Sequence, residues 1–331
     1  MSLENVLDII LITYNRRGFL ENTFEQIFAE NSPIKDFPIT ILDNKSNDGT
    51  YELIQEYKKK FPNINHIVNK RNIGGNANII RAFELVSKKY FWILCDDDNY
   101  DWTHWAEIEQ AIMDDKDVIL TEHLTPGSDL PIEVIVNELN FLPAGIYKSE
   151  IISDDVIHNA YVNIYNSLPH QALVAEVLNK NYKFFVPEHT VIEQNIRKGE
   201  SSGYKRGYRE NIHFRIANFN LFCGMVNSYQ MINDRRIREK CCSCLYIGKS
   251  FKTSMQVFIR ESGLYPYNIC DIFNGVSFTN KLILLWVIFT YPFTKPKKFV
   301  GFTVSEKGLY ISVLGKFCTR ILPRKLLFWV K

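Results

Sequence analysis

The stretch Tyr90-Phe91-Trp92-Ile93-Leu94-Cys95-Asp96-Asp97-Asp98 joins an apolar run directly to three consecutive aspartates. A continuous apolar run of this length is typical of a strand buried in a parallel sheet. Three adjacent carboxylates repel one another, so at the end of a buried strand they favour a compensating cation. Mg²⁺ or Mn²⁺ bridging a diphosphate would supply that charge through hard oxygen ligands. A solvated acidic turn or a helix N-cap would explain the same triplet.

Strand and helix patterns alternate on both sides of this stretch. The predicted strands cover residues 6–12, 38–42, 64–69, 90–95 and 118–122. The predicted helices cover residues 19–28, 51–61, 77–87 and 106–113. This order predicts an α/β fold, with a mainly parallel mixed sheet covered by helices on both faces, that finishes between about residues 142 and 186.

Polar segments follow the first three predicted strands. They are Thr13-Tyr14-Asn15-Arg16, Asp43-Asn44-Lys45-Ser46-Asn47-Asp48-Gly49-Thr50 and Arg71-Asn72-Ile73-Gly74-Gly75-Asn76. Because ligands bind at the carboxyl ends of parallel strands, these segments and the aspartate triplet are expected to form one site. Asp43 is placed to accept a hydrogen bond from a base, and Gly74 at a helix start lets backbone approach an anion. Ordinary helix capping explains each segment equally well.

Composition bounds the class of protein. A net charge of +2 over 331 residues gives no reason to expect a nucleic-acid partner. Seven cysteines, an odd number in which no two C-x-x-C pairs combine as in a zinc site, favour a reduced cytoplasmic setting. No signal peptide is apparent at the start of the sequence, and the apolar run at 282–293 is shorter than the roughly 20 residues that span a bilayer.

The sequence divides into two expected regions. Residues 1–205 form the catalytic domain, with a nucleotide-binding half at 1–100 and an acceptor-side half at 101–205. Residues 206–331 form a mainly helical C-terminal region. Beyond residue 280 basic and apolar residues interleave, which favours peripheral contact with an anionic membrane or a tail docked on the catalytic domain.

In their order and spacing, the three polar segments and the triplet resemble the inverting glycosyltransferase family 2, which has the GT-A fold, across roughly residues 7–197. The resemblance implies that Asp98 is the more direct ligand of Mn²⁺ or Mg²⁺ and that Asp96 also belongs to the metal site, nearer the ribose or sugar. It assigns Gly145, in Pro143-Ala144-Gly145-Ile146-Tyr147, to the loop below the donor sugar and the acceptor. The remaining donor-binding residues that it implies are Thr13, Tyr14, Asn15, Asp43, Arg71, Gly74 and Asp97.

The sequence departs from the family at the expected catalytic base. Where the family carries an acidic Glu-Asp pair, this chain reads Ser167-Leu168-Pro169-His170-Gln171-Ala172. His170 is a candidate base because imidazole accepts a proton near neutral pH. A structural histidine that caps the next helix is an equal alternative, and Asp155, beside Asp154, is a further candidate base.

The expected function is therefore metal-dependent, inverting transfer of a sugar from a nucleoside-diphosphate donor, UDP preferred over dTDP, to a cell-surface glycan. The acceptor would be a lipooligosaccharide, O-antigen or capsule precursor, free or lipid-linked, and the enzyme would be cytoplasmic, with contacts on the cytoplasmic face of the inner membrane. One alternative is a non-catalytic nucleotide- or glycan-binding protein on the same fold. A sugar nucleotidyltransferase ranks lower, because no Gly-rich phosphate loop follows the first strand.

Overall fold

The computed structural model describes residues 2–122, 130–164, 168–193, 225, 228–244, 278, 281–282, 285–286, 300–305, 308–313 and 317–323. The chain divides into two units, one of Met1–Ser201 with Met231–Asn233 and the other of Ser202–Gln230 with Asp234–Lys331.

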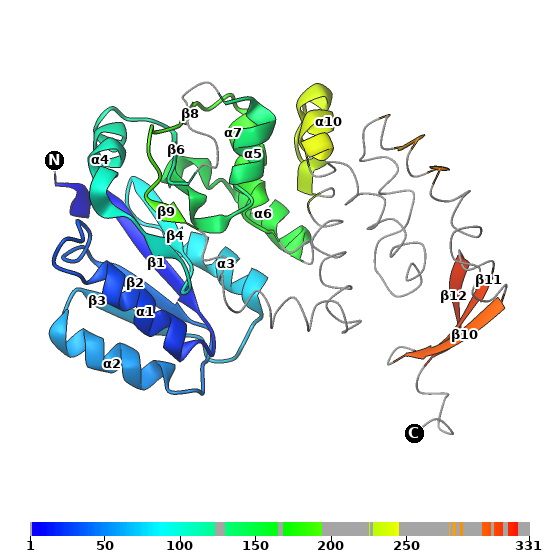
Figure 1. Cartoon of the computed structure of the whole chain (residues 1–331), viewed down its shortest axis with the longest axis horizontal. Helices are drawn as coiled ribbons and strands as arrows, with labels where there is room; N and C mark the ends of the chain where they lie inside the picture. Colours follow the sequence, from blue (N-terminus) through cyan, green and yellow to red (C-terminus); the bar gives the residue numbers. More distant parts are fainter. Residues whose placement is uncertain are drawn as a thin grey trace. The chain divides into compact units, whose positions relative to one another are not determined.

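The first unit contains a seven-stranded sheet in the order β3-β2-β1-β4-β7-β6-β8 (Figure 1). Strands β1 to β4 are parallel, and β7 runs antiparallel between β4 and β6. The predicted mixed α/β sheet is therefore confirmed. The strands are β1 (Leu7–Thr13), β2 (Ile39–Asp43), β3 (Ile64–Val68), β4 (Tyr90–Leu94), β6 (Val118–Leu120), β7 (Gly145–Lys148) and β8 (Phe184–Phe185), and a separate pair is formed by β5 (Asn99–Tyr100) and β9 (Ile192–Glu193).

Helices connect the strands of the first unit. The α-helices are α1 (Arg17–Ile27), α2 (Thr50–Lys60), α3 (Gly75–Glu84), α4 (Trp105–Met113), α5 (Ile132–Glu138), α6 (Asp154–Val162) and α7 (Gln171–Asn179). Short 3₁₀ turns cover η1 (Leu3–Asn5), η2 (Trp102–His104), η3 (Leu142–Ala144) and η4 (Ser149–Ile151). Helix α1 contacts α2, while α3 contacts α6, which in turn contacts α7.

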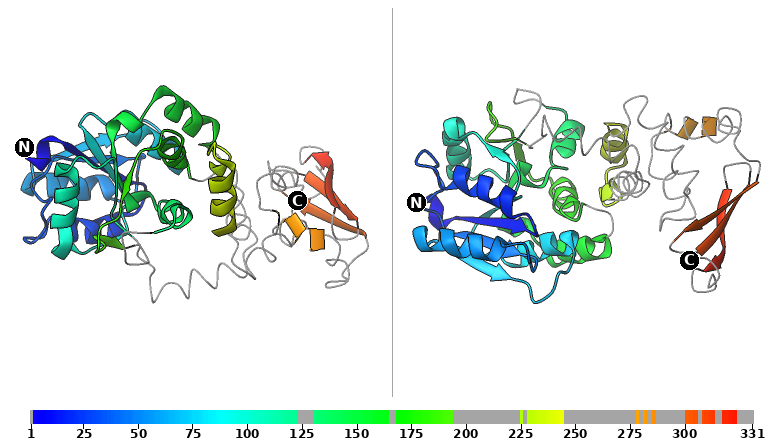
Figure 2. Two further views of the ribbon diagram at one scale, coloured as in Figure 1. Left: turned by 90° about the horizontal axis from the view of Figure 1, so that it is seen from above. Right: turned by 60° about the horizontal axis from the view of Figure 1, so that its bottom comes forward.

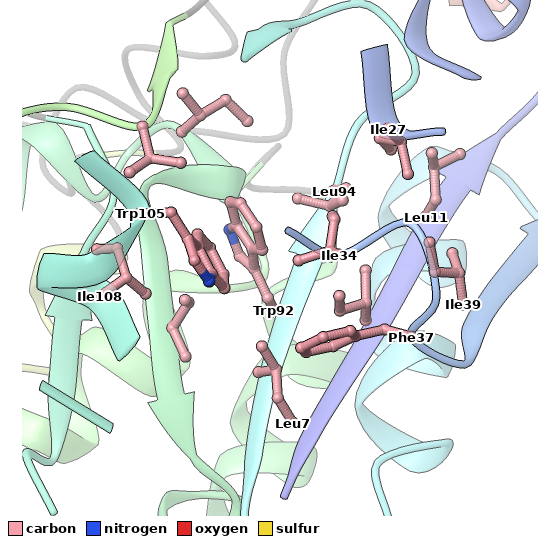
Figure 3. Packing of buried hydrophobic residues seen from close by; sticks show 14 of the residues in the cluster. Leu7, Leu11, Ile27, Ile34, Phe37, Ile39, Trp92, Leu94, Trp105 and Ile108 are labelled. Atoms are coloured by element: carbon pink, nitrogen blue, oxygen red, sulfur yellow. The ribbon is translucent and has the colours of Figure 1, made fainter. Parts of the chain in front are cut away.

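The side chains of alternating residues in β1 point to opposite faces of the sheet. Leu7, Ile9 and Leu11 belong to one buried cluster with apolar residues of α1, α2 and α4 (Figure 3). Within it Trp92 of β4 stacks on Trp105, with ring centroids 5.9 Å apart. Ile10, also buried, lies outside that cluster, as expected for a strand with period-two side chains and both faces covered. Burial on both faces explains why β4 reads as a continuous apolar run.

The register of the parallel strands brings their carboxyl ends to one edge. Thr13, the last residue of β1, pairs with Asp43, the last residue of β2, and Asp43 pairs with Val68 at the end of β3. Leu11 pairs with Leu94, so the aspartate triplet begins beside the end of β1. The polar segments that follow these strands therefore share one edge of the sheet, as predicted.

The second unit contains strands that the prediction of a mainly helical region did not include. Its described residues include α10 (Arg235–Cys244), but also an antiparallel sheet of β10 (Val300–Ser305), β11 (Gly308–Val313) and β12 (Phe317–Pro323) (Figures 1 and 2). These strands were missed because the basic and apolar residues of the segment were interpreted as a membrane-contacting or docked tail. That interpretation overlooked the Val, Ile, Thr, Phe and Tyr residues that favour a strand. Among the described residues, no helix is long and apolar enough to cross a membrane.

Replacing Gly145 by alanine should destabilise the first unit by about 1–3 kcal/mol, the usual cost of overpacking. A Cβ atom at this position would lie 2.6–2.8 Å from two ring carbons and the hydroxyl oxygen of Tyr147. That ring cannot move away easily, because Tyr147 is buried and stacks on Phe91. Urea unfolding of the variant measures the loss. Gly18→Ala is the control, since a Cβ there meets nothing within 4 Å, and an equal loss in both variants would contradict this account.

Candidate active site

The ends of β1 and β4 are joined by a cluster of charged and polar side chains. The Thr13 hydroxyl donates a hydrogen bond of 2.6 Å to Oδ2 of Asp96. The Arg16 guanidinium lies with Nε 3.3 Å from Oδ1 of Asp96 and also pairs with the carboxylate of Asp97. Arg16 itself lies over the ring of Phe19, 4.4 Å from its centroid. One arginine thus faces two carboxylates of the triplet.

Two carboxylates of the triplet are buried. Asp96 and Asp98 are each 3% exposed. Burial raises the pKa of Asp96 to about 6, against the opposing effects of Arg16 and of the Thr13 hydrogen bond. The ionised form is therefore costly in this protein without a further cation. Two buried carboxylates with hard oxygen atoms fit a divalent metal ion bound together with a diphosphate.

Backbone contacts hold the segment around Asp98. Its carbonyl oxygen accepts a hydrogen bond of 3.2 Å from the side-chain amide of Gln26 in α1. The Gln26 side-chain oxygen accepts a hydrogen bond of 3.0 Å from the backbone N–H of Tyr100 in β5. Gln26 thus fixes the chain on both sides of Asn99, directly after the triplet.

Asp43 lies at the expected edge but is almost fully buried, 1% exposed. Its Oδ1 accepts hydrogen bonds from the backbone N–H of Ser46 at 2.9 Å and from the Ser46 hydroxyl at 2.6 Å. Its Oδ2 has no hydrogen-bond partner among the described residues and lies 3.9 Å from Nε2 of His66. In this structure one oxygen of Asp43 holds the turn after β2, as the capping interpretation expects, and the other faces His66.

Asn15 ties the segment after β1 to the segment after β2. Its backbone N–H donates to the Ser46 hydroxyl at 2.8 Å, and its side-chain oxygen accepts from the backbone N–H of Asn47 at 2.8 Å. Asn15 has a φ of 50°, in the left-handed region that Asn tolerates better than most residues. The structure thereby brings Asn15 and Asp43 together through Ser46.

A buried asparagine network fixes the segment before α3. The Asn69 side-chain amide donates to the side-chain oxygens of Asn44 at 2.9 Å and Asn78 at 2.8 Å. Asn44 in turn donates to the side-chain oxygen of Asn72, which accepts from the backbone N–H of Gly74. Gly74 has a φ of 87°, which favours glycine because it has no Cβ. This network sets the start of α3 at the same edge.

Tyr14 and Arg71 are exposed at this edge. No hydrogen bond or ion pair among the described residues joins either of them to the triplet. Gly145 begins β7, and Ile146 after it pairs with Trp92 of β4. The carbonyl of Pro143 accepts hydrogen bonds from Trp92 Nε1 at 2.7 Å and from the Thr121 hydroxyl at 2.6 Å. These bonds place the segment before Gly145 beside the end of β4.

The two predicted bases differ in their surroundings. Asp155 is exposed at the start of α6. The chain enters α6 from the opposite edge of the sheet, because the N–H of Ser149 donates to the carbonyl of Lys89, at the start of β4. The five residues of β4 separate that edge from the triplet by roughly 16 Å. This position argues against Asp155 as the base.

His170 is buried, 3% exposed, at the residue before α7. Its Nε2 lies 3.2 Å from the carbonyl oxygen of Asn140, and the next residue, Gln171, donates to the Leu139 carbonyl and to the Asn140 side chain. Burial lowers the pKa of His170 to about 4, although backbone hydrogen bonds raise it slightly. These contacts favour the structural alternative, a neutral histidine in the packing of α7.

Sequence reasoning missed the roles of Arg16, Gln26 and the asparagine network. Arg16 stood inside a quoted motif, and an arginine near three aspartates is a detectable signal. Gln26 and Asn69 lie in segments that read as ordinary helix and strand end, so only the structure reveals them.

Replacing Thr13 by valine should cost about 1.5–3 kcal/mol at pH 8, because the variant loses a buried hydrogen bond to a charged group. Folding raises the pKa of Asp96 to about 6. Protonated Asp96 therefore stabilises the folded state at low pH, and this stabilisation is lost as the pH rises through about 6. Without the Thr13 hydroxyl that pKa rises further. The deficit of the variant should therefore be larger at pH 8 than at pH 5. Thr40→Val is the matched control for urea unfolding at both pH values, because its oxygen accepts only a long bond of 3.4 Å from Asn65. Equal deficits in both variants would contradict the role given to Thr13.

The parallel sheet, the antiparallel β7 and the acidic triplet after β4 define the GT-A fold, the fold of nucleotide-diphospho-sugar transferases. Residues 8–147 match the family described as Glycosyl transferase family 2, and this segment of the chain is a domain of that family.

Curated relatives of the chain are named as glycosyltransferases, and a solved structure shares its fold. The chain is 29% identical over 127 residues to abequosyltransferase RfbV of Salmonella typhimurium, covering 38% of each chain. It is 30% identical over 93 residues to the GalNAc(5)-diNAcBac-PP-undecaprenol beta-1,3-glucosyltransferase of Campylobacter jejuni, covering 28% of this chain and 29% of that protein. The matches thus span less than two fifths of either relative's length. The mannosyltransferase PcManGT from Pyrobaculum calidifontis, solved with GDP-Man and Mn²⁺, shares the fold with a TM-score of 0.51, 10% identity and 87% coverage of both chains.

Proposed function

We propose that this protein is a metal-dependent, inverting glycosyltransferase that transfers a sugar from a nucleoside-diphosphate donor to a bacterial cell-surface glycan. The observation that carries the proposal is the buried carboxylate cluster at the end of β4, in which Asp96 contacts both Thr13 and Arg16. The cluster lies where open α/β sheets bind ligands, within a family 2 domain.

Mn²⁺ or Mg²⁺ is the proposed cofactor, held by Asp98 and Asp96. When bound, it would stabilise the negative charge that develops on the departing diphosphate. Arg16 has two roles in the proposal. It neutralises part of the triplet's charge while the site is empty, and its pairing with Asp97 keeps that carboxylate turned toward the end of β1.

The proposed donor is a UDP- or dTDP-sugar, with UDP preferred. Thr13, Asn15 and Asp43 lie on two neighbouring segments that are tied together through Ser46, which gives a defined wall for the nucleoside. Arg71 and Gly74, before and at the start of α3, are proposed to face the diphosphate, because a helix start favours anions. Tyr14, exposed beside them, is proposed to line the base pocket.

The proposed acceptor is a lipooligosaccharide, O-antigen or capsule precursor, which would approach from the side of Gly145. The relatives' names support this class, since they include an abequosyltransferase and an undecaprenol-linked glucosyltransferase. The base that removes the acceptor proton is assigned neither to Asp155 nor to His170, given where the structure places them.

Peripheral contact with the cytoplasmic face of the inner membrane is part of the proposal. The basic tail that suggested it lies mostly outside the described residues. Four described residues, Phe278, Leu282, Leu285 and Trp286, are exposed by 40–73%. Their spacing puts them on one face of a helix, as in interfacial segments. Co-sedimentation with anionic vesicles, lost in a Leu282→Glu, Trp286→Glu variant, tests the contact, and equal binding by the variant would contradict it.

Donor hydrolysis tests transferase chemistry against the binding-protein alternative. We expect the full chain with Mn²⁺ to release the nucleoside diphosphate slowly from one sugar nucleotide among UDP-, dTDP- and GDP-sugars, without added acceptor. Release should stop on chelation and resume when Mn²⁺ is restored. Tight nucleotide binding without any release, with or without extracts containing acceptor glycans, would favour a non-catalytic binder.

A further inference from the structure

A second cluster of side chains that can bind a metal involves the segment that follows β5 in the sequence. His104 precedes α4, Glu107 is in its first turn, and His189 is in the segment between β8 and β9. Oε1 of Glu107 lies 2.5 Å from Nδ1 of His189 and 3.9 Å from Nδ1 of His104. One ligand atom from each of the three residues lies within 4.8 Å of the others.

The three side chains are held in place by their surroundings. The second oxygen of Glu107 accepts hydrogen bonds from the backbone N–H groups of Glu188, at 2.6 Å, and His189, at 3.3 Å. The rings of His104 and His189 stack with centroids 3.6 Å apart and planes 6° apart. The i,i+3 spacing puts His104 and Glu107 on one face of the helix start. Two imidazoles and an oriented carboxylate therefore converge from two segments that are distant in the sequence.

We propose that His104, Glu107 and His189 bind one divalent transition-metal ion, Zn²⁺ in the first instance. Bonds of about 2.0–2.2 Å in a tetrahedral site place ligand atoms about 3.3–3.5 Å apart. The two distances at Oε1 of Glu107 lie on either side of that value. A metal lies in the plane of each imidazole that binds it, so one of the two stacked rings must rotate out of the stack when the ion binds. Two His and one Glu with water as the fourth ligand is a common zinc set, whereas Mg²⁺ prefers oxygen ligands alone.

The proposed metal would connect α4 to the segment before β9, the strand that pairs with β5 directly after the aspartate triplet. The carbonyl of Val191 accepts a hydrogen bond of 2.8 Å from Asp101, and β9 then pairs with β5. Holding His189 against α4 fixes the chain two residues before Val191. The proposed role is thus structural, and it is separate from the donor site and independent of the proposed transferase activity.

Cobalt titration of the chelator-treated full chain, with excess Mg²⁺ present to occupy the carboxylate site, tests the proposal. We expect one equivalent of Co²⁺ per chain with the visible absorption of a tetrahedral ion and no thiolate charge-transfer band, displaced by Zn²⁺. Affinity should fall at least about tenfold in His104→Asn, which leaves the Glu107–His189 pair intact, and binding should be lost in His189→Asn. His158→Asn, at an exposed histidine of α6, should bind as wild type.

Hydrogen exchange gives a readout that ordinary surface binding would not move. Zn²⁺ should slow amide exchange in residues 186–193 of wild type and of His158→Asn, and leave it unchanged in His189→Asn. Asp98→Ala should keep both the cobalt spectrum and the protection, which separates this site from the donor site. Unaltered Co²⁺ binding in both histidine variants, a thiolate band, or no binding at all would overturn the proposal.

Discussion

Sugar transfer by an Asp98→Ala variant should fall by about 10²–10³-fold or more in kcat, with no loss of folding. Asp98 is the proposed direct ligand of the metal that stabilises the leaving diphosphate, and loss of one preorganised charge-stabilising group typically costs this much. The carboxylate is buried, so its replacement by alanine removes the cost of keeping a charged group out of water. The unliganded variant is therefore expected to unfold at the same temperature as wild type or higher.

Asp36→Ala, which removes an exposed carboxylate on the connection between α1 and β2, is the matched control. It should keep wild-type turnover and Mn²⁺ dependence, measured as donor hydrolysis or as transfer to a cell-surface glycan acceptor. Equal turnover by Asp98→Ala and wild type, in the same metal concentration, would remove Asp98 from the proposed metal site.

Acid should destabilise the protein through His170. Its pKa is lowered to about 4 in the folded state by burial, against 6.5 for an ordinary histidine. Between these values the unfolded state holds a proton that the folded state does not, so the free energy of unfolding falls as pH falls from 6.5 to 4. The difference of 2.5 between the two pKa values corresponds to about 3 kcal/mol. The stabilising contribution of neutral His170 is fully present above pH 6.5 and fully lost below about pH 4.

Urea unfolding at pH 7.5 and pH 4.5 measures this effect in wild type and in His170→Gln. Glutamine does not titrate, so the loss between the two pH values should be about 2–3 kcal/mol smaller in the variant. His158→Gln, at an exposed histidine, should behave as wild type. The same variants separate the two interpretations of His170, because removal of a general base lowers kcat by about 10²–10⁴-fold. A buried structural histidine predicts that folded His170→Gln stays within about tenfold of wild type.

Most of the fold of the first unit could be predicted from local patterns. Buried parallel strands read as continuous apolar runs, and the runs at residues 6–12 and 90–95 correspond to β1 (Leu7–Thr13) and β4 (Tyr90–Leu94). The parallel arrangement then placed Thr13 and Asp96 at one edge before any contact was known. The three strands of the second unit were missed because charge and hydrophobicity there suggested a surface role and hid a strand preference.

The contacts of the site could be predicted only in part. Asp43 was predicted to read a base, yet the structure turns one oxygen to Ser46 and buries the other beside His66. That orientation depends on the turn after β2 and on the neighbouring β3, which sequence spacing does not specify. The argument against Asp155 is topological, since β7 reverses direction and carries the chain to the opposite edge before α6 begins. His104 and His189 are far apart in the sequence, and their ring contact depends on tertiary pairing such as that of β5 with β9.

The most direct test of the central claim is a thermal-shift panel of UDP, dTDP, GDP and CMP, each with and without Mn²⁺, on wild type and Asp98→Ala. A ligand at 100 times its Kd stabilises the folded state by about 2.7 kcal/mol, which is readily seen as a rise in Tm. We predict a rise for UDP, or for dTDP, that requires Mn²⁺ and disappears in the variant. No shift with any nucleotide, or a shift that persists without metal and in Asp98→Ala, would contradict the donor site proposed at the end of β4.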